Sequence, residues 1–136
     1  MSGDRPERGL LDTSVFIATE SGRALDHARL PQRSSVSVVT LAELRAGVLA
    51  ARDTDTRARR LATLEGIADV EALVVDDRAA AHWARLRFRL VEAGRKANVN
   101  DLWIASVALA HDLPVVTQDG DFEALLDLGG PAVVRV

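Results

Sequence analysis

The sequence predicts an α/β protein, a three-layer α/β/α sandwich with a central, mostly parallel sheet. Short runs rich in valine and leucine alternate with longer segments whose apolar residues recur at helical spacing. Strands that alternate with helices over 136 residues are typical of a parallel sheet covered by helices on both faces. The length suits one domain and no internal repeat is visible, so we expect a single domain over residues 9–136, preceded by a flexible lead over residues 1–8.

Five apolar runs are expected to form the strands of this sheet. They are short and mostly valine, leucine or alanine, as is usual for strands that are buried on both faces. A polar or turn-forming residue follows most of them, which limits each run to strand length. The expected strands cover residues 9–12, 35–39, 72–75, 114–117 and 132–134.

The segments between the strands are expected to be helical. Leu61, Leu64 and Ile67, for example, recur on one side of a helix. Gly94 is a typical residue just past a helix end, and Pro31 cannot continue the helix that precedes it. The expected helices cover residues 14–20, 23–29, 40–51, 53–68, 77–93, 100–111 and 122–128.

The composition excludes several classes of function. The chain has no cysteine, which rules out disulfides, zinc–thiolate sites and thiol nucleophiles. Its three histidines, His27, His82 and His111, are scattered, so an imidazole-rich metal site is not expected. No run approaches the ~20 apolar residues of a membrane span. The first eight residues lack the apolar core of a secretory signal, so we expect a cytoplasmic protein without membrane association.

The basic residues are unevenly distributed, although the formal net charge is −3. They concentrate in two clusters, namely Arg52, Arg57, Arg59 and Arg60, and Arg85, Arg87, Arg89, Arg95 and Lys96. Arginine forks match phosphate geometry, so these clusters can contact a nucleic-acid backbone. They can equally be solvated helix faces. In that second interpretation they form ion pairs with Asp53, Asp55 and Glu92.

Five carboxylates occur where the expected strands end or the expected helices begin. Asp12 and Asp119 fall at the carboxyl ends of strands, and Asp121 follows closely. Glu43 and Asp101 fall in the first turns of helices that begin near the same edge, where such sheets bind ligands. Gathered carboxylates repel one another unless a cation neutralises them, and Mg²⁺ and Mn²⁺ prefer oxygen ligands. The pattern therefore predicts a site for a hard divalent metal.

Each acid also has a purely structural interpretation. Asp12 can cap a helix or form a turn, and residues 40–43 (Thr-Leu-Ala-Glu) match a capping box. Asp101, after an Asn100 cap, complements a helix dipole, and Asp119 can be a turn residue. However, independent caps need not share one edge of one sheet, which favours the metal site.

Four segments carry a resemblance to a known family. They are residues 10–17 (LLDTSVFI), 40–47 (TLAELRAG), 100–105 (NDLWIA) and 116–122 (VTQDGDF). Together they resemble the PIN domain, most closely the VapC-type toxin ribonucleases of bacterial toxin–antitoxin pairs, in that family's order and spacing over essentially the whole chain after Arg8. By position, the resemblance implies an acidic site of Asp12, Glu43, Asp101 and Asp119, with Asp121 as a further candidate ligand and Ser14 and Thr117 as the orienting polar residues.

The resemblance also implies an activity and partners. The chain would be an Mg²⁺- or Mn²⁺-dependent endoribonuclease that cleaves RNA, inhibits growth and translation, and is neutralised by a cognate VapB-type antitoxin. Asp12, Asp101 and Asp119 would ligate the metal, and Glu43 would ligate it or accept a proton from the attacking water. Apolar helices of such toxins form the antitoxin groove and a homodimer interface, so we expect a homodimer or a toxin–antitoxin hetero-oligomer.

Other classes of protein fit the sequence less well. A non-catalytic PIN-like protein-binding module is the main alternative, and the intact set of acids argues against it. A haloacid-dehalogenase-type phosphatase needs an aspartate where Ser14 stands, and a response-regulator receiver needs a lysine on a late strand, whereas Lys96 is expected in a loop. Trp83 and Trp103 lie in apolar helical patterns, which favours core packing or a protein interface over base stacking.

Overall fold

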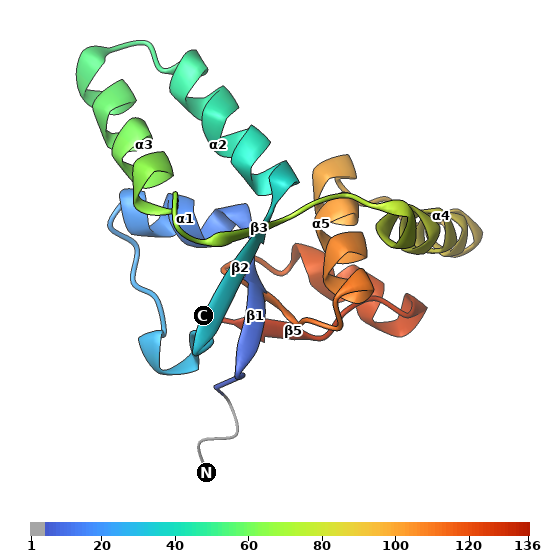
Figure 1. The fold of residues 1–136 in the computed structure, drawn as a ribbon. Coiled ribbons are helices and arrows are strands. Elements are labelled where there is room, and N and C mark those ends of the chain that lie inside the picture. The colour runs from blue at the N-terminus through green and yellow to red at the C-terminus, as the bar shows by residue number, and fades with distance from the viewer. Residues whose placement is uncertain (1–4) are drawn as a thin grey trace.

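The computed structural model describes residues 5–136 and contains one five-stranded sheet. The strand order is β3-β2-β1-β4-β5, and every pairing is parallel, so the predicted α/β sandwich is confirmed (Figure 1). The strands are β1 (Arg8–Leu11), β2 (Arg33–Ser37), β3 (Glu71–Leu73), β4 (Val115–Thr117) and β5 (Val133–Arg135).

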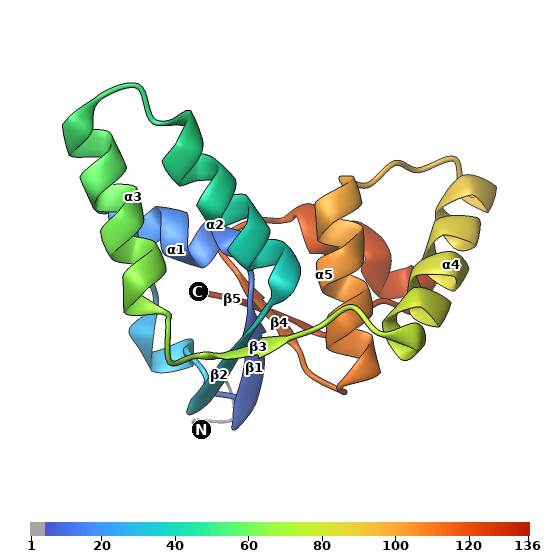
Figure 2. The ribbon, with the colours of Figure 1, turned by 45° about the horizontal axis from the view of Figure 1, so that its top comes forward.

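Helices cover both faces of the sheet. The helix α1 (Thr13–Glu20) and the antiparallel pair α2 (Val38–Ala50) and α3 (Thr54–Gly66) lie on one side in both views (Figures 1 and 2). On the other side lie α4 (Asp77–Glu92), α5 (Val99–Ala110) and the 3-10 helix η2 (Asp121–Leu128). None of the helices in residues 5–136 is long and apolar enough to cross a membrane.

Alternation along the central strands produces two separate cores. Leu10 pairs with Val115 and both belong to the core under α4 and α5. The next pair in the register, Leu11 with Val116, belongs to the core under α1 and α3. Successive side chains of a strand point to opposite faces, so this one-residue step moves the apolar contact from one layer to the other.

One of the predicted helices is wrong. Residues 23–29 form only the short 3-10 helix η1 (His27–Arg29). Gly22 adopts the left-handed conformation (φ 78°) and Arg23 N donates to Ala18 O, so α1 ends in a tight turn that the following residues do not continue as helix. The predicted helix at residues 122–128 is confirmed, and it is the 3-10 helix η2.

Two helix starts also differ from the prediction, and both bear on the acids. The capping-box interpretation of residues 40–43 is wrong because α2 begins at Val38, and Ser37 Oγ accepts the Thr40 N–H at 3.2 Å. Glu43 therefore lies in the second turn of α2, not the first. The cap of α5 is Asn98 rather than Asn100, and it accepts the N–H of Asp101 at 3.3 Å.

The start of the described chain is tied to the sheet. β1 begins at Arg8, one residue earlier than predicted. The carbonyls of Pro6 and Glu7 accept the N–H groups of Gln32 and Arg33 at 3.1 and 2.9 Å. The expected flexible lead therefore has its last residues beside β2, and Met1–Asp4 lie outside the described residues.

Candidate metal centre

Asp12 lies where the order of the sheet reverses. The chain moves from β1 to β2 and β3 on one side, and returns to place β4 on the other side of β1. The carboxyl ends of the strands at such a switch point form the usual ligand site of a parallel α/β sheet. Asp12 follows β1 directly, donates its N–H to Val116 O at 2.9 Å, and is only 3% exposed.

A hydrogen-bond network fixes the Asp12 carboxylate to the end of β4. Thr117 Oγ1 donates to Asp12 Oδ2 at 3.0 Å, and the Ser14 N–H approaches the same oxygen at 3.4 Å. The hydroxyls of Ser14 and Thr117 are 3.1 Å apart, and they accept the N–H groups of Gln118 and Asp119, each at 3.0 Å. Ser14 and Thr117 are thus placed where they can orient the acids, as the resemblance implies.

Asp12 also acts as the N-cap of α1, so the predicted capping role is confirmed. Burial raises the pKa of its carboxyl above 3.8, and the hydrogen bonds from Ser14, Thr117 and the backbone oppose that rise. A buried carboxylate with one oxygen bonded and no basic neighbour among these causes favours either a proton or a cation.

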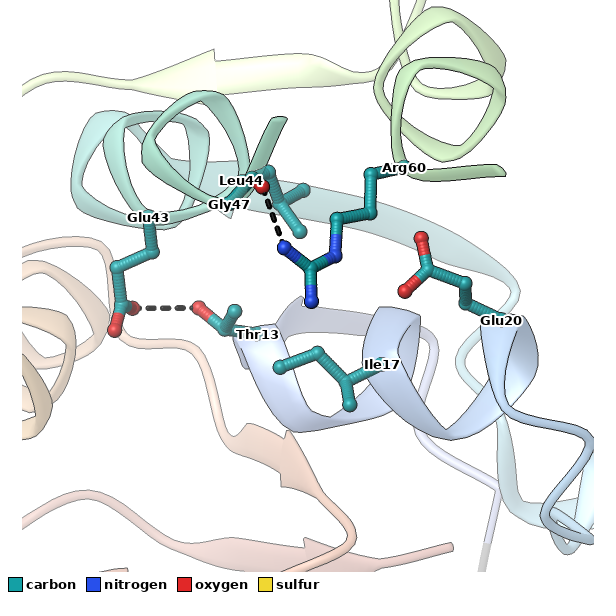
Figure 3. A pocket seen from close by; sticks show the side chains of 7 residues that line it. All are labelled: Thr13, Ile17, Glu20, Glu43, Leu44, Gly47 and Arg60. Atoms are coloured by element: carbon teal, nitrogen blue, oxygen red, sulfur yellow. Dashed lines mark hydrogen bonds between the residues drawn. The ribbon is translucent and has the colours of Figure 1, made fainter. Parts of the chain in front are cut away.

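Glu43 reaches the same edge from α2. Thr13 Oγ1 donates to Glu43 Oε1 at 2.7 Å and lies 3.0 Å from Thr40 Oγ1. Figure 3 shows Thr13 on α1 and Glu43 on α2 pointing toward each other at one end of a cavity of ≈ 280 Å³. Thr13 is not among the predicted site residues. It is 30 positions from Glu43 in the sequence, and no local pattern signals a contact at that separation.

Arg60 lies at the other end of that cavity. Its Nη1 donates to Gly47 O at 2.6 Å, and Figure 3 shows its guanidinium between α2 and the Glu20 carboxylate. Thr63, also on α3, donates to Glu20 Oε1 at 3.1 Å. The cavity beside Glu43 is therefore closed at its far end by contacts that join α3 to α1 and α2.

The pKa of Asp101 is raised by burial and also by the charge of every other acid of the predicted site. Asp101 is partly buried in the first turn of α5. Burial raises its pKa to about 7, with further contributions, in decreasing order, from the charges of Asp12, Asp121, Glu43 and Asp119. Repulsion of this kind falls off with distance, so the fold brings acids from four separate segments into one electrostatic neighbourhood.

Asp119 and Asp121 form the more exposed side of the group. Asp119 is partly buried after β4, and Asp121 is exposed at the start of η2. Burial raises the pKa of Asp119, as do the charges of Asp12 and Asp121, while Arg23 and Arg135 oppose the rise. The candidate site therefore opens to solvent beside η2.

The donor set fits a hard divalent cation, although the acids are not yet in contact with one another. It consists of carboxylate oxygens with hydroxyl support, which is the ligand chemistry of Mg²⁺ and Mn²⁺. Within residues 5–136, however, no three acidic or imidazole side chains stand close enough to share one ion. In the described residues the acids thus gather at one edge of the sheet, but they do not form a complete coordination site for an ion.

The arginine clusters do not form the predicted ion pairs. Among the described residues, no ion pair involves the three acids expected to balance them, Asp53, Asp55 and Glu92. Instead, Arg57 and Arg60 donate to the carbonyls of Ala51 and Gly47 and so join α3 to the end of α2. Part of the first cluster is therefore structural.

Comparisons with known proteins agree with this fold. Residues 9–126 match the PIN domain family. Ribonuclease VapC5 of Mycobacterium tuberculosis is 62% identical over 131 residues, which are 96% of this chain and 97% of the relative. Ribonuclease VapC4 of the same organism is 41% identical over 121 residues, 89% and 93% of the two chains.

A solved structure supports the same assignment. The crystal structure of VapBC-5, a member of the VapBC family of toxin–antitoxin systems from Mycobacterium tuberculosis, contains a chain with a TM-score of 0.90 and 58% identity. The match covers 96% of this chain and 100% of that one. With the family match, the two relatives and the sheet order in agreement, the chain belongs to the PIN domain family.

Proposed function

We propose that this chain is a divalent-metal-dependent endoribonuclease of the VapC type, the toxin of a toxin–antitoxin pair. The observation that supports it most is the neighbourhood of Asp101, whose pKa is raised first by burial and then by the charges of Asp12, Asp121, Glu43 and Asp119. The names of the similar proteins, ribonucleases VapC5 and VapC4, give the reaction class.

The acids divide into two roles in this proposal. Asp12, Asp101 and Asp119 hold Mg²⁺ or Mn²⁺, with Asp121 as a further candidate at the exposed rim. Closing around an ion requires the partly exposed side chains of Asp101 and Asp119 to move toward Asp12, which its hydrogen bonds already hold in place. A bound divalent ion supplies Lewis-acid stabilisation of charge that develops on phosphate oxygens.

Glu43 is the candidate general base. Its Oε1 accepts the Thr13 hydroxyl, which orients the carboxylate, and no hydrogen bond within residues 5–136 occupies Oε2. Oε2 can therefore accept a proton from a water that attacks the phosphodiester, provided that the substrate places that water within hydrogen-bond reach. Glu43 can instead ligate the ion, and both roles remain part of the proposal.

A cognate VapB-type antitoxin is the proposed protein partner. The solved relative is titled as a toxin–antitoxin system, VapBC-5. In this chain, apolar side chains remain exposed on the layer that contains the Glu43 cavity, with Ile17 at 46%, Leu61 at 44% and Leu49 at 83%. A protein segment that covered them would also obstruct access to Glu43. Homodimerisation and cytoplasmic residence stay predictions from the sequence.

The decisive experiment is RNA cleavage with and without divalent metal. Total RNA should be cut by the protein with Mg²⁺ or Mn²⁺, and cleavage should stop with chelator. Asp101→Asn should lose roughly a hundredfold or more of the rate, because it removes a ligand and a charge at the reacting phosphate. An Asp101→Asn protein that melts as a folded domain yet cleaves at the normal rate would rule the assignment out. Calorimetry of Mn²⁺ binding to both proteins tests the metal role without relying on activity.

A further inference from the structure

A second cavity, on the α4–α5 side of the molecule, combines an aromatic ring with unpaired cations. Its volume is ≈ 330 Å³, within the range of small-molecule sites. We call it the basic cavity, and its principal lining residues are Trp83, Arg87, Leu90, Lys96, Val99 and Leu102. No acid is among the lining residues, so its electrostatic character is positive.

The aromatic wall is a stacked pair. Trp83 on α4 and Trp103 on α5 lie with ring centroids 4.9 Å apart and planes 18° from parallel. Both side chains are partly buried, and Trp83 also lines the basic cavity. The prediction was core packing or a protein interface. Trp83 does pack against the core, and it also keeps a surface toward the cavity.

The cations of the basic cavity differ in availability. Arg95 also lines it, but its two terminal nitrogens hold the Asp127 carboxylate at 2.7 and 2.9 Å, which attaches the α4–α5 loop to η2. Arg87 and Lys96 are exposed, and neither has an ion pair within residues 5–136. Two positive charges are thus free to meet an anion.

The basic cavity and Asp101 belong to the same turn of α5 but lie on different sides of it. Val99 and Leu102 line the cavity, and Asp101 lies between them in sequence. With 3.6 residues per turn, Asp101 points about 200° around the helix from Val99 and about 100° from Leu102. Because a helix with its side chains is only about 10–12 Å wide, an RNA strand that crosses this end of α5 can place one phosphate at Asp101 and another nucleotide at the cavity.

We propose that the basic cavity is a subsite for single-stranded RNA that binds a nucleotide near the one being cleaved, on the other side of the first turn of α5. Arg87 and Lys96 contact its phosphates, and the Trp83 ring and the Val99 and Leu102 side chains contact its base. This inference rests on the proposed function. RNA is a polyanion and is repelled by the five carboxylates of the candidate site, so its binding there requires cationic side chains nearby. A protein partner could also cover the apolar surface of the cavity, but the two unpaired cations favour an anionic ligand such as RNA.

The test is RNA binding measured in chelator, where cleavage is prevented. A fluorescein-labelled, unstructured RNA of mixed sequence is titrated with the wild type and with Arg87→Gln/Lys96→Gln. Each phosphate contact on a single strand contributes about 0.7 to the slope of log K against log salt, so the double variant should lower the slope by about 1.4. In cleavage assays it should raise KM severalfold, roughly 5- to 10-fold, with kcat nearly unchanged.

The matched control removes the same charge elsewhere. Arg8→Gln/Arg33→Gln lies at the amino ends of β1 and β2, at the opposite edge of the sheet from the strand ends that carry Asp12 and Asp119. All four arginine and lysine side chains in the two variants are exposed, so neither variant should impair folding. The control should keep the wild-type salt slope and KM. Equal losses in both variants would mean that only net charge matters, and would overturn the proposal.

Intrinsic fluorescence gives an independent readout. The chain has two tryptophans and no tyrosine, and both tryptophans belong to the stacked pair. RNA bound in the basic cavity should quench their emission, with a midpoint that matches the anisotropy titration. Unchanged emission at saturating RNA would contradict the proposal. So would a change in sedimentation of Arg87→Gln/Lys96→Gln without a change in RNA affinity, which would identify a protein contact instead.

The two proposals fail in different ways. If Asp101→Asn abolishes cleavage while the double variant binds RNA like the wild type, the subsite is wrong and the nuclease stands. If RNA binding depends on Arg87 and Lys96 while Asp101→Asn cleaves normally, the proposed catalytic site is wrong.

Discussion

The acids carried by strand ends are held differently from the acids carried by helices. Asp12 is buried, and its Oδ2 accepts a hydroxyl and approaches a backbone N–H, all fixed by the pairing of β1 with β4. Asp101 is partly exposed on a helix, and burial together with four like charges raises its pKa to about 7. Hydrogen bonds thus fix the position of Asp12 at the strand end. Asp101 on the helix experiences repulsion from the other acids, which a bound cation would relieve.

The largest effect is expected from a substitution of the acid on the helix, Asp101. Asp101→Asn should reduce metal-dependent cleavage by roughly a hundredfold or more. Removing a repelled charge should at the same time make the metal-free protein more stable near neutral pH. Cleavage rates and thermal melts of the same preparation measure both. A variant that lost activity and stability together would indicate a folding defect rather than the loss of a ligand.

A substitution that disturbs the strand-end acid Asp12 should lower the stability of the protein, whereas Asp101→Asn should raise it. Thr117→Val removes the hydroxyl that donates to Asp12 Oδ2 while keeping the shape of the side chain. We expect a roughly 10- to 100-fold loss of cleavage, as is typical when the support of a ligand is removed. Stability should fall by about 1–3 kcal/mol because buried polar groups lose their partner. Thr117→Ser, which restores a hydroxyl, is the matched control and should recover most of the activity.

The pH dependence of stability sharpens the contrast. Asp101 has a pKa of about 7 in the folded state, against an ordinary value of 3.8, so between these values the folded state binds more protons than the unfolded state. The free energy of unfolding should therefore fall as pH rises from about 4 to 7, by about 1–3 kcal/mol after allowance for solvent screening.

Denaturant titrations across this pH range, without metal, measure the effect. In Asp101→Asn the decline should be shallower, and Mn²⁺ should flatten it in the wild type by favouring the charged carboxylate. A wild-type stability that rises steadily through this range would show that the acids do not repel one another in the folded state.

The smallest effect concerns the orientation of Glu43. Thr13→Val removes the hydroxyl that donates to Glu43 Oε1 at 2.7 Å, and it leaves both carboxylate oxygens in place. We expect a loss of about 3- to 10-fold in kcat, corresponding to the ~1 kcal/mol of a single hydrogen bond. Thr13→Ser should retain the wild-type rate. An identical loss in both variants would attribute the effect to packing rather than to the hydrogen bond.

The strand-borne half of the site was predictable from sequence because its signals are local. Asp12 and Asp119 each follow an apolar run, and parallel strands bring such run ends to one edge. The helix-borne half was placed on the correct edge but with the wrong local structure. Ser37 and Asn98 start their helices earlier than the residues that resembled caps, because several adjacent polar residues can cap and tertiary contacts decide among them.

Contacts across long separations could not be predicted. The bond from Thr13 to Glu43, the stack of Trp83 on Trp103 and the basic cavity all join residues from different helices, and no periodicity in one segment records its neighbour in another. The failed helix at residues 23–29 has a different cause. Gly22 reverses the chain in a conformation that other residues rarely adopt, and helix propensity over the next seven residues did not reveal this turn.

The central position of β1 has a consequence for synthesis of the protein. Its neighbour β4 is translated about a hundred residues later, since the bond between Thr117 and Asp12 spans 105 positions. Until that late segment leaves the ribosome, Asp12 lacks the Thr117 hydroxyl and Asp119 cannot reach its place beside it. The acidic site therefore cannot assemble on a nascent chain that lacks β4. Any activity of the site begins only after β4 has been translated and has paired with β1.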